Sequence, residues 1–233
     1  MALGCWAPLA LLLALLVARH IAPAPQAHRP PVRVQRPNGW LLRLMAIQGC
    51  AGLCLSAFIT FFGVHASSLG VTPASIGLMI SAFGVTGVLS RLLLTPLGAA
   101  FRDETVLLGG LFLFALATIV LMQLATPARH WPLWAAVVGM GLSLVASNAV
   151  AMSMLLREPR FGGVAGSAGL LSLGFFGGIA LGPPLFAVLL RQPGSFTAGW
   201  TLLMIALCLG AGLCRSLYRA RQVSEGCADA GTA

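Results

Sequence analysis

Residues Gly162–Leu190 read GGVAGSAGLLSLGFFGGIALGPPLFAVLL, an uncharged apolar stretch with glycines at regular spacing. Gly174, Gly178 and Gly182 recur every fourth residue, so in a helix they form one stripe that carries no side chains. In water each glycine would cost a helix about 1 kcal/mol relative to alanine. In lipid the backbone must hydrogen-bond to itself, and small residues let a neighbouring helix approach closely. The stretch therefore predicts a membrane-spanning helix that packs tightly against another helix.

A proline pair lies near the far end of the same stretch. Pro183 has no amide hydrogen and crowds the carbonyl of Ile179, so we expect a bend there. A glycine surface that ends in a bend suits a helix that rocks against its neighbour, which is more typical of a transporter than of a membrane anchor. The residues that we assign to helix packing and gating are Gly169, Gly174, Gly178, Gly182, Pro183 and Pro184.

The composition of the whole chain is that of a polytopic membrane protein. Its 233 residues are 58% hydrophobic and 8% charged, with a mean hydropathy of +0.94, whereas about 25% of residues are charged in a soluble domain. The 6 cysteines show no metal-ligand or redox spacing and are interpreted as small packing residues. We therefore expect no metal and no cofactor.

Apolar runs long enough to cross a bilayer need about 20 residues, and the chain holds seven candidates. They lie near residues 3–18, 40–64, 75–99, 105–125, 131–156, 162–190 and 198–218. The predicted fold is an all-α integral membrane protein with about seven transmembrane helices. We divide the chain into a leading helix (1–20), a linker rich in Pro and Arg (21–39), a six-helix unit (40–220) and a tail (221–233).

The arginines between these runs predict the orientation of the chain. One set of alternate loops and the carboxyl-terminal tail carry Arg19, Arg29, Arg33, Arg36, Arg102, Arg157, Arg160, Arg215, Arg219 and Arg221. The opposite set of loops carries only Arg129 and Arg191. Because cytoplasmic loops collect positive charge, we predict a cytoplasmic linker, a cytoplasmic carboxyl terminus and a multi-pass location in a bacterial inner membrane.

The first apolar run has two interpretations. Small residues at Ala22, Ala24 and Ala27 offer a cleavage site for a signal peptide, but a signal carries positive charge before its apolar run, and here the arginines follow it. A spanning helix is the preferred interpretation. Cleavage would leave the orientation of the other six helices unchanged.

Two motifs resemble those of the major facilitator superfamily. Residues 87–103, GVLSRLLLTPLGAAFRD, are similar to its loop signature, although Ala99 and Ala100 stand where an Asp-Arg pair is expected. The spacing of Gly169, Gly178, Gly182 and Pro183 resembles the glycine-proline signature of antiporter members, with Phe186 and Ala187 in place of its final glycine pair. Six helices behind a leading helix and an arginine-rich inner linker resemble the sixth to twelfth helices, the carboxyl-terminal half of such a transporter.

The resemblance implies that segments 40–64 and 131–156 line a substrate cavity. The polar residues on these segments are Gln48, Ser56, Thr60, Ser143, Ser147 and Asn148. The alternative is that these groups form hydrogen bonds between helices. Arg91 is the charged candidate, because an ionisable residue at membrane depth is by default a functional hypothesis. No Asp, Glu or His lies in the middle of any predicted span, so we identify no proton-coupling carboxylate.

The functional hypothesis is transport of an unidentified small solute by a half-length secondary transporter, alone as a homodimer or with a second transporter half. The alternative is a membrane-embedded fragment or interaction module that does not transport. An enzyme is not expected, because Ser167 in a Gly-Ser-Ala-Gly turn has no base within reach. The basic clusters are explained by topology and by anionic lipids, so no nucleic-acid partner is expected.

Overall fold

The computed structural model describes residues 37–100, 103–191 and 195–230, which belong to one compact unit from Val34 to Ala233. Its elements are α2 (Gly39–Ser68), α3 (Pro73–Ala100), α4 (Glu104–Met122), α5 (Trp131–Arg157), the 3₁₀ turn η2 (Pro159–Phe161), α6 (Val164–Leu190) and α7 (Ser195–Ala230). Six of these helices are long and apolar enough to cross a membrane. The predicted all-helical multi-pass fold is confirmed. The predicted leading helix at 1–20 lies outside the described residues.

Side-chain caps fix two of the helix starts. Asn38 precedes α2, and its side-chain oxygen accepts a hydrogen bond from the amide of Leu41 at 2.8 Å. Asp103 precedes α4 and accepts one from the amide of Thr105 at 2.9 Å. Such caps satisfy amide groups that have no partner within the first turn. Each helix consequently begins one residue earlier than predicted.

Helices α6 and α7 differ from their predicted limits. Gly162 has a φ of 95°, a backbone conformation that favours glycine, so α6 begins at Val164 instead of Gly162. The helix then runs through Pro183 and Pro184 to Leu190 without interruption. Helix α7 continues to Ala230, so most of the segment predicted as a tail, 221–233, extends the last helix.

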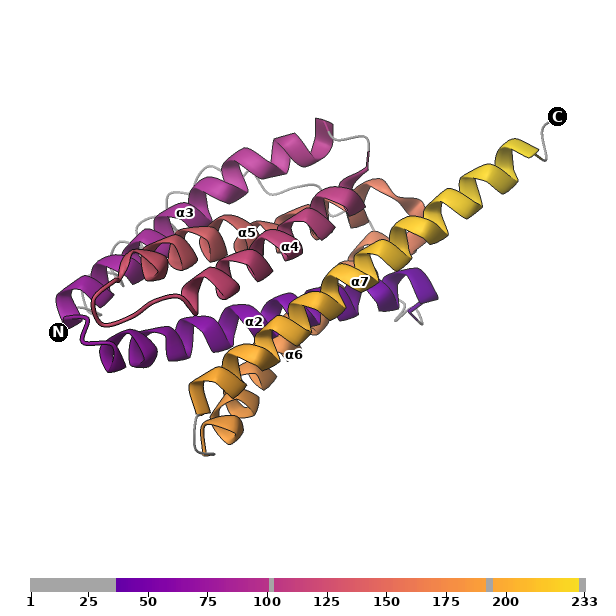
Figure 1. Cartoon of the computed structure of the whole chain (residues 1–233). Helices are drawn as coiled ribbons and strands as arrows, with labels where there is room; N and C mark the ends of the chain where they lie inside the picture. The colour runs from indigo at the N-terminus through magenta and orange to yellow at the C-terminus, as the bar shows by residue number, and fades with distance from the viewer. Residues whose placement is uncertain (1–36, 101–102, 192–194, 231–233) are drawn as a thin grey trace, which may run out of the picture. The chain divides into compact units, whose positions relative to one another are not determined.

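Four helices form a closed ring. Helix α2 packs against α5, α5 against α4, α4 against α7, and α7 against α2. The two remaining helices flank this ring, α6 lying along α2 and α3 along α5 (Figure 1). Accordingly, α5 is the most buried span, and α3 and α6 are the least buried. Helices α3 and α6 each contact both members of the α2–α5 pair.

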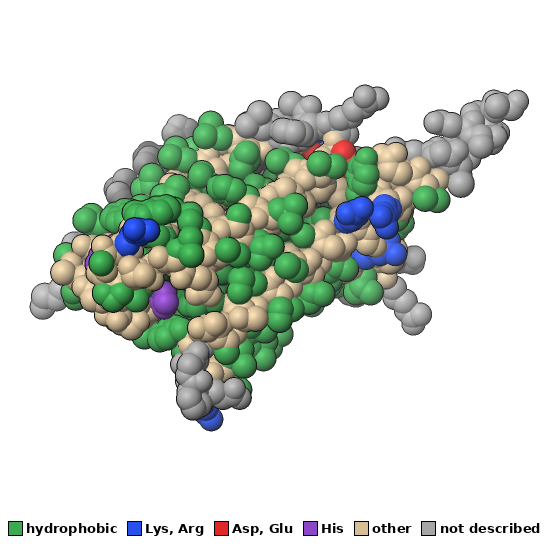
Figure 2. Space-filling model, in the orientation of Figure 1, with side chains coloured by type: hydrophobic (Ala, Val, Ile, Leu, Met, Phe, Trp, Pro, Cys, Tyr) green, Lys and Arg blue, Asp and Glu red, His purple; other side chains and the backbone are tan. Residues whose placement is uncertain are grey.

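The outer surface of the ring is mostly apolar, as expected for a surface in contact with lipid. Figure 2 shows hydrophobic side chains spread over α4 and α7, with basic side chains gathered beside the carboxyl-terminal half of α7. Exposed apolar side chains on these two helices include Val106, Leu113, Phe114, Ile205 and Leu209. Exposing these apolar side chains to water would be unfavourable. In a bilayer they contact the lipid chains instead.

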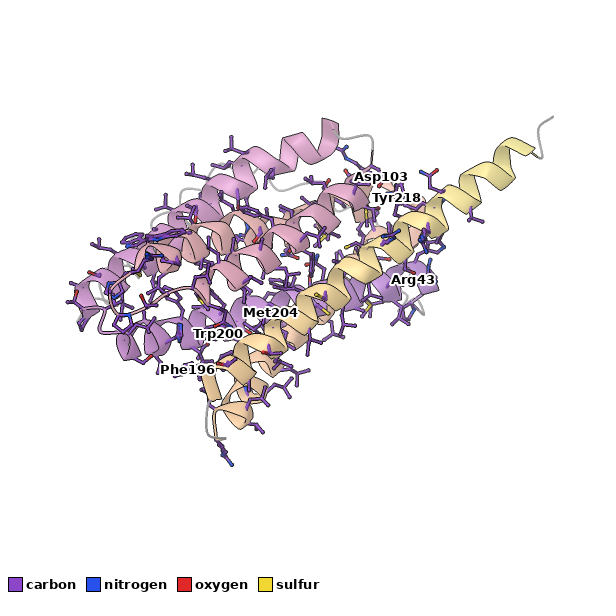
Figure 3. All side chains as sticks on the ribbon, in the orientation of Figure 1. Arg43, Asp103, Phe196, Trp200, Met204 and Tyr218 are labelled. Atoms are coloured by element: carbon purple, nitrogen blue, oxygen red, sulfur yellow. The ribbon has the colours of Figure 1, made fainter. Side chains whose placement is uncertain are left out.

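The two ends of the bundle differ in chemistry. Phe196 and Trp200 lie toward one end, and Arg43, Asp103 and Tyr218 lie toward the other (Figure 3). At the aromatic end, the rings of Phe186 and Trp200 meet edge to face at 5.0 Å and join α6 to α7. Such a pair contributes about 0.5–1.5 kcal/mol beyond its buried area. The opposite end is held by ion pairs, which are described below.

Candidate functional site

The glycine stripe of α6 lies directly against the backbone of α2. A Cβ atom added at Gly174 would lie 2.7 Å from the carbonyl oxygen of Met45. One added at Gly178 would lie 2.9 Å from the carbonyl carbon of Gly49 and closer still to its oxygen. Neither site has room for a side chain, so the two helices approach as closely as their backbones permit.

This contact is reciprocal. A Cβ atom at Gly182 would lie 2.5 Å from the carbonyl oxygen of Leu53 on α2. Conversely, one at Gly52 of α2 would overlap the carbonyl of Phe175 on α6. Gly52 was not assigned to packing from the sequence, because Gly49 and Gly52 do not show the four-residue repeat seen in α6. The α2–α6 contact therefore uses glycine on both helices.

The other residues assigned to helix packing and gating have different surroundings. Nothing lies within 4 Å of a Cβ atom added at Gly169, so this glycine is not needed for close approach. Pro183 is half-buried and Pro184 is exposed, both within continuous helix. A gating role for these residues stays a prediction.

The four candidate hydroxyl groups donate to carbonyl oxygens of their own helices. These bonds are Ser56 to Leu53 at 3.2 Å, Thr60 to Ser56 at 2.8 Å, Ser143 to Gly139 at 2.7 Å, and Ser147 to Leu144 at 2.8 Å. None of these four hydrogen bonds joins two helices, so they do not form the interhelical bonds considered as the alternative. Ser143 and Ser147 are buried, Ser56 is half-buried and Thr60 is exposed.

Gln48 connects α2 to α5 and keeps one unsatisfied atom. Its Nε2 donates to the carbonyl oxygen of Ser147 at 3.3 Å. Its Oε1 is buried and has no hydrogen-bond partner among the described residues. A buried acceptor without a partner costs about 1–3 kcal/mol, and such a group calls for an explanation by function or by a bound molecule.

Arg91 of α3 contacts α5 at Val145, about one helical turn before Asn148. The Nε of Arg91 donates to the carbonyl oxygen of Val145 at 3.3 Å. A helical carbonyl points toward the residue four positions later, and Asn148 follows Val145 by three positions on the same side of α5. The guanidinium therefore lies at the level of the Asn148 side chain. Arg91 is exposed and Asn148 is half-exposed, so both are accessible on the described surface.

Gln48, Arg91 and Asn148 share one depth in the bundle. Gln48 lies nine residues after the start of α2, and Arg91 and Asn148 lie nine residues before the ends of α3 and α5. The hydrogen bonds of Gln48 to Ser147 and of Arg91 to Val145 place both side chains within one turn of Asn148 on α5. We call these three residues the polar level. It extends across three helices, with α5 in the middle.

Close packing between α3 and α5 holds Arg91 in place. A Cβ atom at Gly141 would lie 2.9 Å from the carbonyl oxygen of Phe83. The hydroxyl of Ser90 donates to the carbonyl oxygen of Gly141 at 3.1 Å. This contact is not evident from the sequence. Both helices contain small residues that could have indicated close packing. These residues do not recur every fourth position, as the glycines of α6 do.

An ion-pair cluster joins three helices at the end of the bundle nearer to the polar level. The Nη1 of Arg221 lies 3.0 Å from Oδ1 of Asp103, and its Nη2 lies 3.2 Å from Oε2 of Glu158. Nη1 also donates to the hydroxyl of Thr105 at 2.8 Å. Nearby, Arg157 pairs with Glu104 at 3.5 Å. In the sequence these acids lie between separate predicted spans, and no local pattern connects them to the last helix.

The described residues hold no group of three or more His, Cys, Asp or Glu side chains that could bind a metal ion. Residues 44–230 match the profile of the Major Facilitator Superfamily, over nearly all of α2 to α7. The chain belongs to the major facilitator superfamily. The resemblance inferred from the two motifs is thereby confirmed. No curated protein sequence shows a significant match to the chain.

In a member of the major facilitator superfamily, the polar level is a candidate part of the solute pathway. The superfamily consists of membrane transporters, so polar groups inside this bundle are assessed as parts of a solute pathway. The groups available at the polar level are a guanidinium, which donates hydrogen bonds, and two carboxamides, which both donate and accept them. This set can bind a polar or anionic solute but offers no activated nucleophile.

Proposed function

We propose that this chain transports a small solute across the membrane by alternating access, as one half of a major-facilitator-type secondary transporter. The observation that carries the proposal is the polar level formed by Gln48, Arg91 and Asn148 on three helices of an otherwise apolar bundle. Polar and ionisable groups inside a membrane are costly and mark solute pathways. In secondary transporters such groups lie near the middle of the membrane, between structural repeats.

A second half would complete the site. The bundle presents six spans, with the polar level on α2, α3 and α5. We infer that a second copy of the chain or a separate transporter half packs against these helices. The arginine distribution supports a cytoplasmic carboxyl terminus and a bacterial inner membrane, because positive charge collects in cytoplasmic loops.

The α2–α6 contact constrains the transport movement. Because glycine backbones touch along Gly174, Gly178 and Gly182, separation or sliding of the two helices would lose packing over a long surface. We infer that α2 and α6 move as one unit. Alternating access then comes from tilting of the whole bundle against the second half, instead of rocking of α6 against α2.

Transport is tested with the full chain in sealed liposomes. The probes are radiolabelled organic acids, amino acids, sugars and hydrophobic cations, and the oligomeric state is measured in parallel. We expect a dimer, or a complex with a six-helix partner, and saturable uptake of at least one probe. A stable monomer that moves none of these probes would instead support the membrane-embedded interaction module.

Gln48→Met is expected to reduce solute flux while leaving the stability of the fold nearly unchanged. The substitution removes the unsatisfied Oε1 together with the hydrogen bond to Ser147, so the free energy of unfolding should change by less than about 1 kcal/mol. Solute flux should fall strongly, because one group of the polar level is lost. Unfolding in sodium dodecyl sulfate and flux in liposomes measure the two effects.

The matched control is Gln123→Met at the exposed end of α4, which should preserve both stability and flux. The prediction would be contradicted if Gln48→Met lost much of its stability but kept its flux per folded molecule. Gln48 would then have a structural role and no role in transport.

A further inference from the structure

A groove lies on the outer surface of the bundle, between the first turns of α4 and the carboxyl-terminal half of α7. Its volume is about 580 Å³. Gly109 and Gly110 line it from α4, and Gly212 lines it from α7, with Arg215 and Tyr218 at one end. It lies on the surface of a membrane-spanning bundle, where lipid is the solvent.

The glycines leave the groove open. Nothing lies within 4 Å of a Cβ atom added at Gly110 or Gly212, so these glycines are not needed for close packing of the two helices. A Cβ atom added at Gly109 would lie 3.5 Å from the Cβ of Cys214, an ordinary van der Waals distance. The groove is therefore a space from which side chains are missing, and its walls apart from Arg215 and Tyr218 are largely apolar. An apolar chain would fit there.

The charge at one end of the groove is positive. The described acids at this end are Asp103, Glu104 and Glu158, and they pair with Arg221, Arg157 and Arg160. Arg215 and Arg219 are exposed and form no ion pair or hydrogen bond with the described part of the chain. Both lie on α7, one helical turn apart. They supply positive charge on the α7 side of this end, in addition to the exposed Arg43 on α2.

We propose that the α4–α7 groove binds an anionic phospholipid. One acyl chain lies along Gly110 and Gly212, and the phosphate is held by Arg215 with the hydroxyl of Tyr218. Basic pockets between membrane helices bind anionic headgroups, and tyrosine is typical of the membrane interface. The charge complementarity distinguishes this lipid from a zwitterionic one. The proposal does not depend on transport.

The test uses native mass spectrometry of the purified full chain with palmitoyl-oleoyl phosphatidylglycerol or phosphatidylcholine. We expect tighter binding of phosphatidylglycerol. Arg215→Gln should reduce the preference about five-fold, as expected for one interfacial charge. Gly212→Leu and Gly110→Leu, which fill the groove, should each weaken both lipids about ten-fold, equivalent to losing about two buried methylene groups.

Two controls match these variants. Gly177→Leu adds the same side chain on α6, where nothing lies within 4 Å of the added Cβ. Arg43→Gln removes an exposed charge at the same end of the bundle as Tyr218 (Figure 3). Both should bind phosphatidylglycerol as the wild type does.

The proposal would be overturned by equal affinity for the two lipids, by unchanged binding after the groove is filled, or by displacement of phosphatidylglycerol by inorganic phosphate alone. A change of oligomeric state in Gly212→Leu would also overturn it, because the groove would then be an interface between two copies of the chain. If Gly212→Leu does not fold, Gly110→Leu and Arg215→Gln decide the outcome.

Discussion

Gly178→Leu is expected to destabilise the bundle by about 3 kcal/mol or more, because the new side chain has to displace backbone and no flexible side chain can move aside. The added Cβ would lie 2.9 Å from both the carbonyl carbon of Gly49 and the amide nitrogen of Leu53. Relief requires that α6 move away from α2, which also breaks the contacts at Gly174 and Gly182. Unfolding of the full chain in sodium dodecyl sulfate measures the loss.

The neighbouring residue provides a matched control. Gly177→Leu makes the same change in the same turn of α6, but nothing lies within 4 Å of its added Cβ. It should leave stability unchanged or raise it slightly, because leucine favours the helix over glycine. Equal stability of the two variants would show that the glycine stripe does not hold α6 against α2.

Arg221→Gln is expected to cost about 3 kcal/mol, because it removes the countercharge of the largely buried Asp103 and leaves Glu158 with the longer 3.9 Å pair to Arg160. The side chain of Arg221 is 17% exposed, and those of Asp103 and Glu158 are 19% and 14% exposed. At this degree of burial, solvent and salt screen the pairs only in part. The start of α4 should loosen first, since Asp103 both caps α4 and pairs with Arg221. Hydrogen exchange of the first amides of α4 reports this local change.

A double substitution distinguishes lost pairing from general damage. Adding Glu158→Gln to Arg221→Gln removes the carboxylate that lost its pair with Nη2 and should recover part of the lost stability. Arg219→Gln, on the exposed side of the same helix, should change stability by less than about 0.5 kcal/mol. If Arg221→Gln is as stable as Arg219→Gln, the ion-pair cluster does not secure the helix ends.

Much of the fold could be predicted from local properties of the sequence. Apolar runs long enough to cross a bilayer located the helices within a few residues, because in lipid the backbone has little choice except helix. The largest difference is at the carboxyl end of α7, which continues to Ala230 through a segment predicted as a tail. Gly162 delays α6 through its positive φ, and the two prolines leave the helix unbroken.

The candidate site was predictable in its residue types but not in its arrangement. Gln48, Arg91 and Asn148 were identified because polar groups are rare in membrane helices. Their common depth became visible only when α2, α3 and α5 were placed together. The hydroxyls of Ser143 and Ser147, which were expected to line a cavity or to join helices, are buried and bond to their own helix.

By itself the sequence determined that this chain is a membrane bundle of the major facilitator superfamily, and that α6 has one face without side chains. Only the tertiary structure decided which helix that face meets, which acids Arg221 pairs with, and where the α4–α7 groove opens. The physical reason is that a helix in lipid is apolar on every side. Its periodicity therefore does not reveal which face packs against protein, and partners far apart in the chain are selected by the fit of whole helices.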